Sequence, residues 1–278
     1  MDKNKIVTLI NRSPELVELH DREGWLNLFS ASAIVEDPVG AGQNRKGKDM
    51  RKGKDGLGRF YDIFIGPNTI EFTVHQDIVI GNEMVRDVSL RTTLPNRAVS
   101  VVGALLLYRV VDEGGQLKIE NLRVHWDFTA NATALLKKNG FKGIPAATVQ
   151  FGTMIKVQGM KRVIEYCGAM YKGIRGKGIK AVNAFAAALN SRDETSFQHL
   201  FDTDGTIEFP AGKKVSPLDF FKLAAKDLKI DASGLRSGGW YTSCIFAITG
   251  GGANSKGVAF FQFNPNTKKI CSARFFWD

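Results

Sequence analysis

The spacing of apolar residues changes from a helical to a strand period along the first part of the chain. Within 1–127, apolar residues first recur at the 3.6-residue period of a helix, in 4–19, 21–30 and 53–65. Runs with strand character follow, separated by turn-forming residues: 69–80, 83–94, 98–111 and 117–128. Helices followed by strands are typical of an α+β domain. We expect three helices packed on a curved antiparallel sheet of four or more strands.

Two segments far apart in the chain share one pattern. Residues 13–40 align without a gap with 185–212. The aligned segments have these identical pairs: Asp21/Asp193, Leu28/Leu200, Phe29/Phe201, Glu36/Glu208, Pro38/Pro210 and Gly40/Gly212. A second shared pattern, Ile-x3-Arg-x2-Trp-Asp, occurs at 119–127 and at 270–278. Because both matches occur in the same order, the sequence predicts two tandem copies of one domain.

The predicted copies span 1–127 and 180–278, and a partly helical linker joins them over 128–179. Asp21 is placed to cap the helix that follows it. In the second copy we expect helical segments at 178–191, 196–201 and 216–228, and strands near 238–249, 255–264 and 268–277. In the linker, Met160, Val163, Ile164 and Cys167 have helical spacing.

Composition and charge narrow the class of protein. Of the 278 residues, 44% are hydrophobic and 24% charged, which excludes a disordered chain and favours a large core. The net charge is +10, with basic clusters at 45–54 and 156–180. The first cluster is interpreted as a solvated loop, or as a lid or contact for anions. Since no nucleic-acid-binding module accompanies either cluster, nucleic acid is not expected as a partner.

Signals for export, membrane insertion and metal binding are not found in the sequence. It has neither a signal-peptide pattern nor an apolar run of membrane-span length, so we expect a cytoplasmic protein. Cys167, Cys244 and Cys271 form no CxxC and are expected to be buried reduced thiols. The histidines lack metal-ligand spacing. We expect no metal and no cofactor.

The hexapeptide Val-Glu-Asp-Pro-Val-Gly at 35–40 contains the candidate for chemistry. Asp37 follows a short apolar run and precedes a proline. An Asp-Pro pair commonly forms a turn. The alternative interpretation is a carboxylate that acts as a general base.

This hexapeptide resembles the signature of the ketosteroid isomerase family, within the SnoaL-like, nuclear-transport-factor-type cone fold. The resemblance extends back through Phe29, Leu28, Gly24 and Asp21. It resumes at Gly53, Leu57, Phe60-Tyr61, Tyr108-Arg109 and 119–126 and so covers essentially all of the first copy. It implies that Asp37 is the general base that moves a proton between two carbons of a hydrophobic, enolisable ketone. Apolar walls would raise the proton affinity of such a carboxylate.

The resemblance also implies hydrogen-bond donors for the enolate oxygen, and both are replaced. The family's tyrosine falls on Ser13 and its protonated aspartate on Leu106. Loss of one such donor commonly costs ~10² to 10³ in rate. Tyr61 matches a family tyrosine that supports the first, so it is the candidate replacement, or else Phe60-Tyr61 packs the third helix on the sheet. Ser13 is expected to cap a helix before Pro14.

The family's pocket wall maps onto Leu122, Val124 and Trp126, which share one strand face. With Leu106 and Tyr108 they are the expected substrate-binding residues. Arg123, His125 and Asp127 point to the other face, where Arg123 and Asp127 are expected to be structural. Arg86 lies on the same strand face as Val88 and Leu90, so one alternative is that it is a polar group inside the cone.

The second copy has Phe209 at the position of Asp37 and Phe185 at that of Ser13. It therefore cannot perform this proton transfer, and we expect a filled or apolar interior. Its expected role is to replace a partner subunit in an internal pseudo-dimer, with a homodimer also possible. Two functions stay open for the chain: an isomerase-like enzyme, or a non-catalytic ligand-binding or assembly module.

Overall fold

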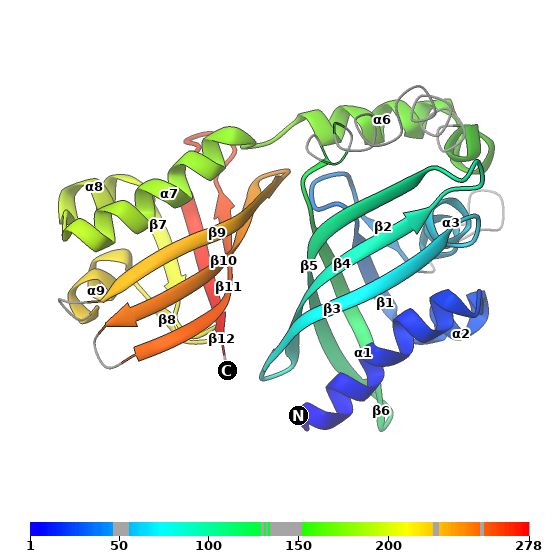
Figure 1. The fold of residues 1–278 in the computed structure, drawn as a ribbon, viewed down its shortest axis with the longest axis horizontal. Helices are drawn as coiled ribbons and strands as arrows, with labels where there is room; N and C mark the ends of the chain where they lie inside the picture. The colour runs from blue at the N-terminus through cyan, green and yellow to red at the C-terminus, as the bar shows by residue number, and fades with distance from the viewer. Residues whose placement is uncertain are drawn as a thin grey trace. The chain divides into compact units, whose positions relative to one another are not determined.

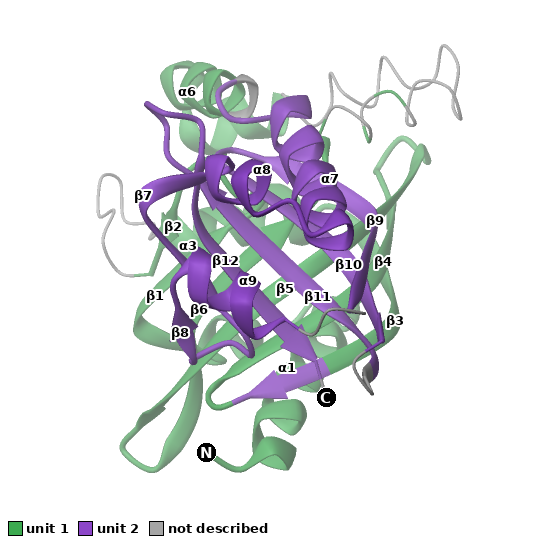
Figure 2. Ribbon diagram, turned by 90° about the vertical axis from the view of Figure 1, so that its left-hand side faces the viewer, with its two compact units in different colours: residues 1–77, 81–171 green, residues 78–80, 172–278 purple. Residues whose placement is uncertain are grey.

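The computed structural model divides the chain into two compact units (Figure 2). Unit 1 comprises 1–77 and 81–171, and unit 2 comprises 78–80 and 172–278. The structure describes residues 1–46, 56–128, 131, 133, 152–224, 228–250 and 253–277. Most of the basic cluster 45–54 and of the segment between 128 and 152 lies outside the described residues.

Unit 1 begins with two helices, but two strands separate them from the third helix, whereas the apolar spacing predicted all the helices before the strands (Figure 1). Its first helices are α1 (Lys3–Glu18), α2 (Arg22–Asn27), α3 (Gly56–Phe60) and the π-helix η1 (Tyr61–Ile65). Its strands are β1 (Phe29–Glu36), β2 (Asn44–Arg45), β3 (Thr69–Ile80), β4 (Glu83–Thr93), β5 (Val99–Glu113) and β6 (Gln116–His125). The four predicted strands are confirmed within a few residues, whereas β1 and β2 were not predicted.

One six-stranded sheet forms the body of unit 1, in the order β2-β1-β6-β5-β4-β3. β1 runs parallel to β6, so the sheet is mixed rather than wholly antiparallel. This parallel pairing places the end of β1 beside the end of β6. The expected α+β cone therefore forms, and the unpredicted strand β1 delivers Asp37 to it.

Helix α1 differs at its start from the expectation. Asp2, rather than Ser13, is its N-cap, and the Asp2 side chain accepts a hydrogen bond from the Asn4 backbone N–H. Ser13 and Pro14 lie inside the helix, and Ser13 is buried. Its hydroxyl accepts a hydrogen bond from Trp25 Nε1 at 3.1 Å. Because a side-chain partner holds Ser13 in the interior, the residue packs α2 onto α1 rather than capping a helix.

The segment between the repeats contributes helix α6 (Met160–Tyr171) to unit 1. Val163 and Met154 are buried in one cluster with Ile63 of η1. Met160 and Ile164, which share the helical spacing, are 54% and 64% exposed. The amphipathic pattern thus predicted the helix, but only part of its apolar side packs on unit 1.

Unit 2 repeats the architecture of unit 1 (Figure 1). Its helices are α7 (Gly176–Ser191), α8 (Glu194–His199) and α9 (Pro217–Leu223). Its strands are β7 (Phe201–Glu208), β8 (Lys214–Val215), β9 (Lys229–Gly238), β10 (Tyr241–Gly250), β11 (Ala253–Phe263) and β12 (Ile270–Trp277). Their order, β8-β7-β12-β11-β10-β9, is that of the first sheet. The tandem repeat is therefore present in the fold.

Equivalent contacts stabilise each of the two copies from within. Asp21 caps α2, and Asp193 caps α8 in the same way. The carboxylate of Glu36 pairs with Arg123 at 3.0 Å, and Glu208 pairs with Arg274 at 2.8 Å. The peptide bonds before Pro38 and Pro210 are both cis. The identical residues of the sequence repeat thus have the same structural roles, and the repeated arginine is structural as expected.

Among the described residues, no helix is long and apolar enough to cross a membrane. All three cysteines are free. Cys244 is buried, whereas Cys167 and Cys271 are only partly buried.

Candidate functional site

Asp37 lies in the tight turn that follows β1. Two contacts fix this turn against β6: Glu36 pairs with Arg123, and the Val39 N–H donates to the Val124 carbonyl at 3.0 Å. Because β1 and β6 are parallel and in register here, Asp37 faces the residues at the end of β6. Asp37 and Pro38 therefore form the turn that an Asp-Pro pair predicts, and this turn also holds the Asp37 carboxylate beside the end of β6.

The carboxylate of Asp37 accepts a hydrogen bond from Trp126. Trp126 Nε1 donates to Asp37 Oδ1 at 2.7 Å. Burial raises the pKa of Asp37 from 3.8 to about 6, and the Trp126 hydrogen bond opposes this rise. A carboxylate with this pKa is ionised at neutral pH and is a stronger proton acceptor than an exposed one.

The structure brings the remaining predicted wall residues onto one face of the sheet. Leu106 pairs with Val124 and Tyr108 pairs with Leu122 across β5 and β6, and all four side chains are buried. Since paired residues in a sheet point to the same side, these four form one patch. The patch is apolar except for the Tyr108 hydroxyl.

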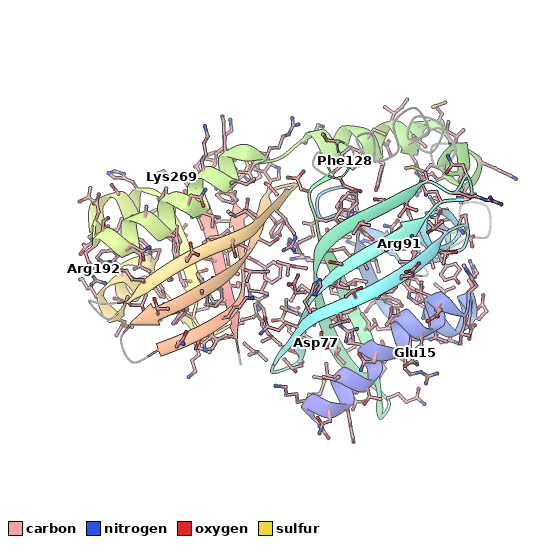
Figure 3. All side chains as sticks on the ribbon, viewed as in Figure 1. Glu15, Asp77, Arg91, Phe128, Arg192 and Lys269 are labelled. Carbon is pink, nitrogen blue, oxygen red and sulfur yellow. The ribbon has the colours of Figure 1, made fainter. Side chains whose placement is uncertain are left out.

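A polar cluster centred on the buried Arg86 adjoins this patch. Arg86 pairs with Leu106 across β4 and β5 and is only 2% exposed. Its guanidinium makes two hydrogen bonds of 2.7 Å to Asp77 of β3, labelled in Figure 3, and a further one to Asn11 of α1. Arg86 therefore lies in the interior, which is one of the alternatives that the sequence left open. The buried charge is neutralised by Asp77.

Tyr108 lies within electrostatic range of both Arg86 and Asp37. Burial raises the pKa of Tyr108 above its ordinary range, Arg86 opposes the rise, and the charges of Asp77 and Asp37 add to it. The hydroxyl therefore remains protonated at neutral pH.

Tyr61 has different neighbours. It is buried and packs on Trp25, with ring centroids 5.6 Å apart. Burial raises the pKa of Tyr61, and so do the charges of Asp21 and Asp62, whereas Arg22 lowers it. Among the described residues its hydroxyl has no hydrogen-bond partner. The aromatic packing is thus observed, and a donor role for Tyr61 stays a prediction.

Sequence reasoning missed Tyr166 as a site residue. Its hydroxyl donates to the main-chain carbonyl of Asp37 at 3.5 Å. The helical spacing of 160–167 predicted a helix here, but nothing in the sequence placed that helix over the turn at Asp37. The ring packs on Phe64 of η1, with centroids 5.9 Å apart.

Unit 2 has the same turn without the polar groups. The Ala211 N–H donates to the Phe275 carbonyl at 2.8 Å, as Val39 does to Val124 in unit 1. Phe209 replaces Asp37 and packs on Trp277, the counterpart of Trp126, with centroids 4.4 Å apart. By strand register, Phe261 replaces Tyr108 and Cys244 replaces Arg86.

Aromatic side chains fill the interior of unit 2. The following phenylalanines belong to one buried cluster: Phe185, Phe197, Phe201, Phe220, Phe221, Phe246, Phe261, Phe263 and Phe275. Phe185, at the position of Ser13, contacts four rings of this set besides Phe197. The filled, apolar interior expected for the second copy is therefore observed.

Part of the second basic cluster lies around a cavity of unit 2. Arg175, Lys177 and Lys180 line this cavity of about 470 Å³ together with Lys268. Among the described residues, no group of three or more His, Cys, Asp or Glu side chains could hold a metal ion. The four basic residues that line this cavity belong to unit 2, whereas Asp37 belongs to unit 1.

Comparison with known proteins gives matches among solved structures alone. No protein-family model and no curated protein sequence matches the chain. The chain is similar to the Δ5-3-ketosteroid isomerase from Mycobacterium sp., with 34% identity over 45% of this chain and 95% of that chain, at a TM-score of 0.39. It is 25% identical to RV0760c from Mycobacterium tuberculosis in complex with estradiol-17beta-hemisuccinate, with the same coverage and TM-score. The epoxide hydrolase/cyclase-like enzyme SalBIII is 19% identical over 46% of this chain and 95% of its own, with a TM-score of 0.39.

Proposed function

Because the chain belongs to the ketosteroid isomerase family, we propose that unit 1 binds a hydrophobic carbonyl compound and that Asp37 is the general base of a proton-transfer reaction. The Asp37 carboxylate takes a proton from a carbon next to the carbonyl and leaves an enolate. Protonated Asp37 then returns the proton to another carbon of the same molecule. No proton is gained or lost overall, and the double bond of the substrate has moved.

The environment of Asp37 suits this role. The base must be ionised before the reaction and must hold the proton afterwards, so its pKa should be near the working pH. A pKa of about 6 meets both requirements better than that of an exposed aspartate. Trp126 holds one carboxylate oxygen and thereby orients the other. Leu106, Tyr108, Leu122 and Val124 form the apolar surface on which a flat hydrophobic molecule would pack.

The contrast between the two units carries the proposal. Both units have the same turn and the same tryptophan, but only unit 1 has a carboxylate there. A carboxylate in an apolar setting lowers stability, and Phe209 shows that this turn forms without one. The turn therefore does not need the carboxylate in order to form, which supports a chemical role for Asp37.

The test uses a 3-oxo-Δ5-steroid as substrate and follows formation of the conjugated Δ4 product by ultraviolet absorbance. Asp37→Asn keeps the side-chain volume and an acceptor for Trp126, so it removes the base alone. We expect turnover by the unaltered protein and a loss of ~10² to 10⁴ in kcat in Asp37→Asn. The control, Asp231→Asn on an exposed position of β9, should turn over normally. Equal rates in Asp37→Asn would refute the proposal. Saturable steroid binding without turnover would favour the non-catalytic ligand-binding module.

A further inference from the structure

We propose that Tyr166, on the helix α6 that precedes the second repeat, donates the hydrogen bond to the substrate carbonyl in unit 1. This inference rests on the proposed function and assigns the donor that the reaction needs. Negative charge develops on the carbonyl oxygen as the proton leaves carbon, and a donor aimed at that oxygen stabilises the transition state.

The two positions where the family resemblance implies donors do not supply one. Leu106 is apolar, and Ser13 has a short side chain whose hydroxyl is engaged by Trp25 Nε1 at 3.1 Å. Ser13 therefore belongs to the contact between α1 and α2. Tyr61, the replacement that the sequence suggests, has its pKa shifted by the charges of Asp21, Arg22 and Asp62 and not by that of Asp37. We therefore look for the donor near Asp37 on another element of unit 1.

Helix α6 brings one to the turn at Asp37. Val163 packs α6 onto η1 in the cluster that contains Ile63. The ring of Tyr166 packs on that of Phe64, with the ring centroids 5.9 Å apart. The Tyr166 hydroxyl lies 3.5 Å from the main-chain carbonyl oxygen of Asp37. The carbonyl of a ketone and its acidic C–H are on neighbouring carbons, so base and donor have to converge within a few ångströms. The Tyr166 hydroxyl lies next to the main chain of the residue that supplies the base and is within electrostatic range of its carboxylate, which places it in the neighbourhood where such a donor is needed.

The hydrogen bond that Tyr166 makes within unit 1 is a weak one. An O–H···O hydrogen bond has its optimum near 2.7 to 2.8 Å, and the Tyr166 bond is 3.5 Å long. The hydroxyl has one proton to donate, so an oxygen that develops negative charge would compete well for it. Burial and the charge of Asp37 raise the pKa of Tyr166 above its ordinary range, which keeps that proton in place at neutral pH.

Tyr108 is the alternative donor within the same site. Its hydroxyl is also in electrostatic range of Asp37, but Arg86 and Asp77, which form an ion pair, both influence its pKa more than Asp37 does. We therefore assign Tyr108 to the wall, and the experiment includes its phenylalanine variant as a competitor.

The test compares Tyr166→Phe, Tyr108→Phe and Asp37→Asn with the unaltered protein in the steroid assay. Tyr166→Phe keeps the ring that packs on Phe64 and removes only the hydroxyl. We expect kcat to fall ~10² to 10³ in Tyr166→Phe, the size of a lost oxyanion donor, with KM changed little. Ile164→Ala, on the exposed side of the same helix, is the matched control and should keep the rate of the unaltered protein.

A second readout measures the hydrogen bond itself. The infrared carbonyl stretch of a bound, ¹³C-labelled 3-oxo-Δ4-steroid should shift to lower frequency in the unaltered protein and lose that shift in Tyr166→Phe. If Asp37→Asn is inactive but Tyr166→Phe keeps the normal rate and the normal carbonyl frequency, the assignment of Tyr166 is wrong and the proposed function stands. The same outcome with a slow Tyr108→Phe would move the role to Tyr108. A normal rate in Asp37→Asn would overturn the proposed function itself.

Discussion

The indole nitrogen of Trp126 donates a 2.7 Å hydrogen bond to the carboxylate of Asp37. This bond joins the turn after β1 to the residue after β6, at the place where the two strands run parallel. In unit 2 the same tryptophan position meets a phenyl ring. One scaffold therefore holds a polar pair in one copy and an apolar pair in the other, which allows the chemistry of Asp37 to be tested against a control within the same chain.

Replacing Asp37 with Asn should stabilise the protein at neutral pH. The pKa of Asp37 is raised from 3.8 to about 6 in the folded state, so the folded state holds its proton more tightly than the unfolded state. Stability is therefore lost as the pH rises from about 3.8 through 6. At about pH 8 Asp37→Asn should gain up to ~3 kcal/mol, less where solvent screens the charge.

Urea unfolding at about pH 8 and at about pH 4 measures this gain. The stability gain of Asp37→Asn should shrink as the pH falls and vanish below about pH 3.8, because Asp37 is then protonated in both the folded and the unfolded state. Asp231→Asn, on an exposed strand position, should show no such trend. A gain that is the same at both pH values would mean that ionisation of Asp37 is not its cause.

Replacing Trp126 with Phe should raise the pKa of Asp37 further. The Trp126 hydrogen bond is the contact that lowers this pKa, so its loss should move the rise of kcat/KM to a pH above 6. The variant should also lose about 1.5 to 3 kcal/mol of stability above that pH. The matched control is Trp277→Phe in unit 2, where the tryptophan packs on Phe209. A pH profile that shifts equally in both variants would disprove a direct effect on Asp37.

Replacing Phe209 with Asp should unfold or strongly destabilise unit 2 without adding a second site. Phe209 contacts Phe220, Phe275 and Trp277. The loss of this large, partly buried ring costs up to about 3 kcal/mol, and a carboxylate against this apolar cluster adds a desolvation penalty. Thermal unfolding followed by circular dichroism measures the loss. A stable variant with doubled turnover would contradict the account of unit 2 as a filled copy.

Replacing Arg274 with Met should destabilise the protein more at neutral than at acid pH. Burial pulls the pKa of Glu208 upward, but Arg274, the Gly212 N–H and Lys214 together hold it below its usual 4.5. The ion pair thus contributes stability above about pH 4.5, which is lost as the pH falls through the lowered pKa. We expect a loss of about 1.5 to 3 kcal/mol near pH 7 and a smaller one near pH 3. Urea midpoints at the two pH values check this, and an equal loss at both would rule out the ion pair as the cause.

The sequence predicted the strands whose alternation is regular and missed those whose alternation is interrupted. β3 was expected at 69–80 and is Thr69–Ile80. β1, with the sequence Phe-Ser-Ala-Ser-Ala-Ile-Val-Glu, has small residues where a long apolar side chain would mark the buried face. β9 is rich in Ser and Gly and was likewise missed. Both are strands because their neighbours in the sheet pair with them, which local spacing does not encode.

For the site, the sequence supplied Asp37 and its wall but not the helix that covers the turn. The wall residues were expected from the family resemblance, and the two-residue strand period fixed the face of each side chain. The contact of Tyr166 with Asp37 joins residues 129 positions apart and depends on how α6 packs on η1. Helical spacing gave the existence of α6, whereas its position arises from tertiary packing.

The most direct test of the central claim is the pH dependence of kcat/KM for a 3-oxo-Δ5-steroid in the unaltered protein and in Asp37→Asn. The base must be ionised in the free protein, so kcat/KM should rise with pH and level off above about pH 6, the raised pKa of Asp37. Asp37→Asn should have a rate lower by ~10² or more and lack this rise. A rate independent of pH between about 4 and 8, or an Asp37→Asn profile that matches the unaltered protein, would contradict the assignment of Asp37 as the base.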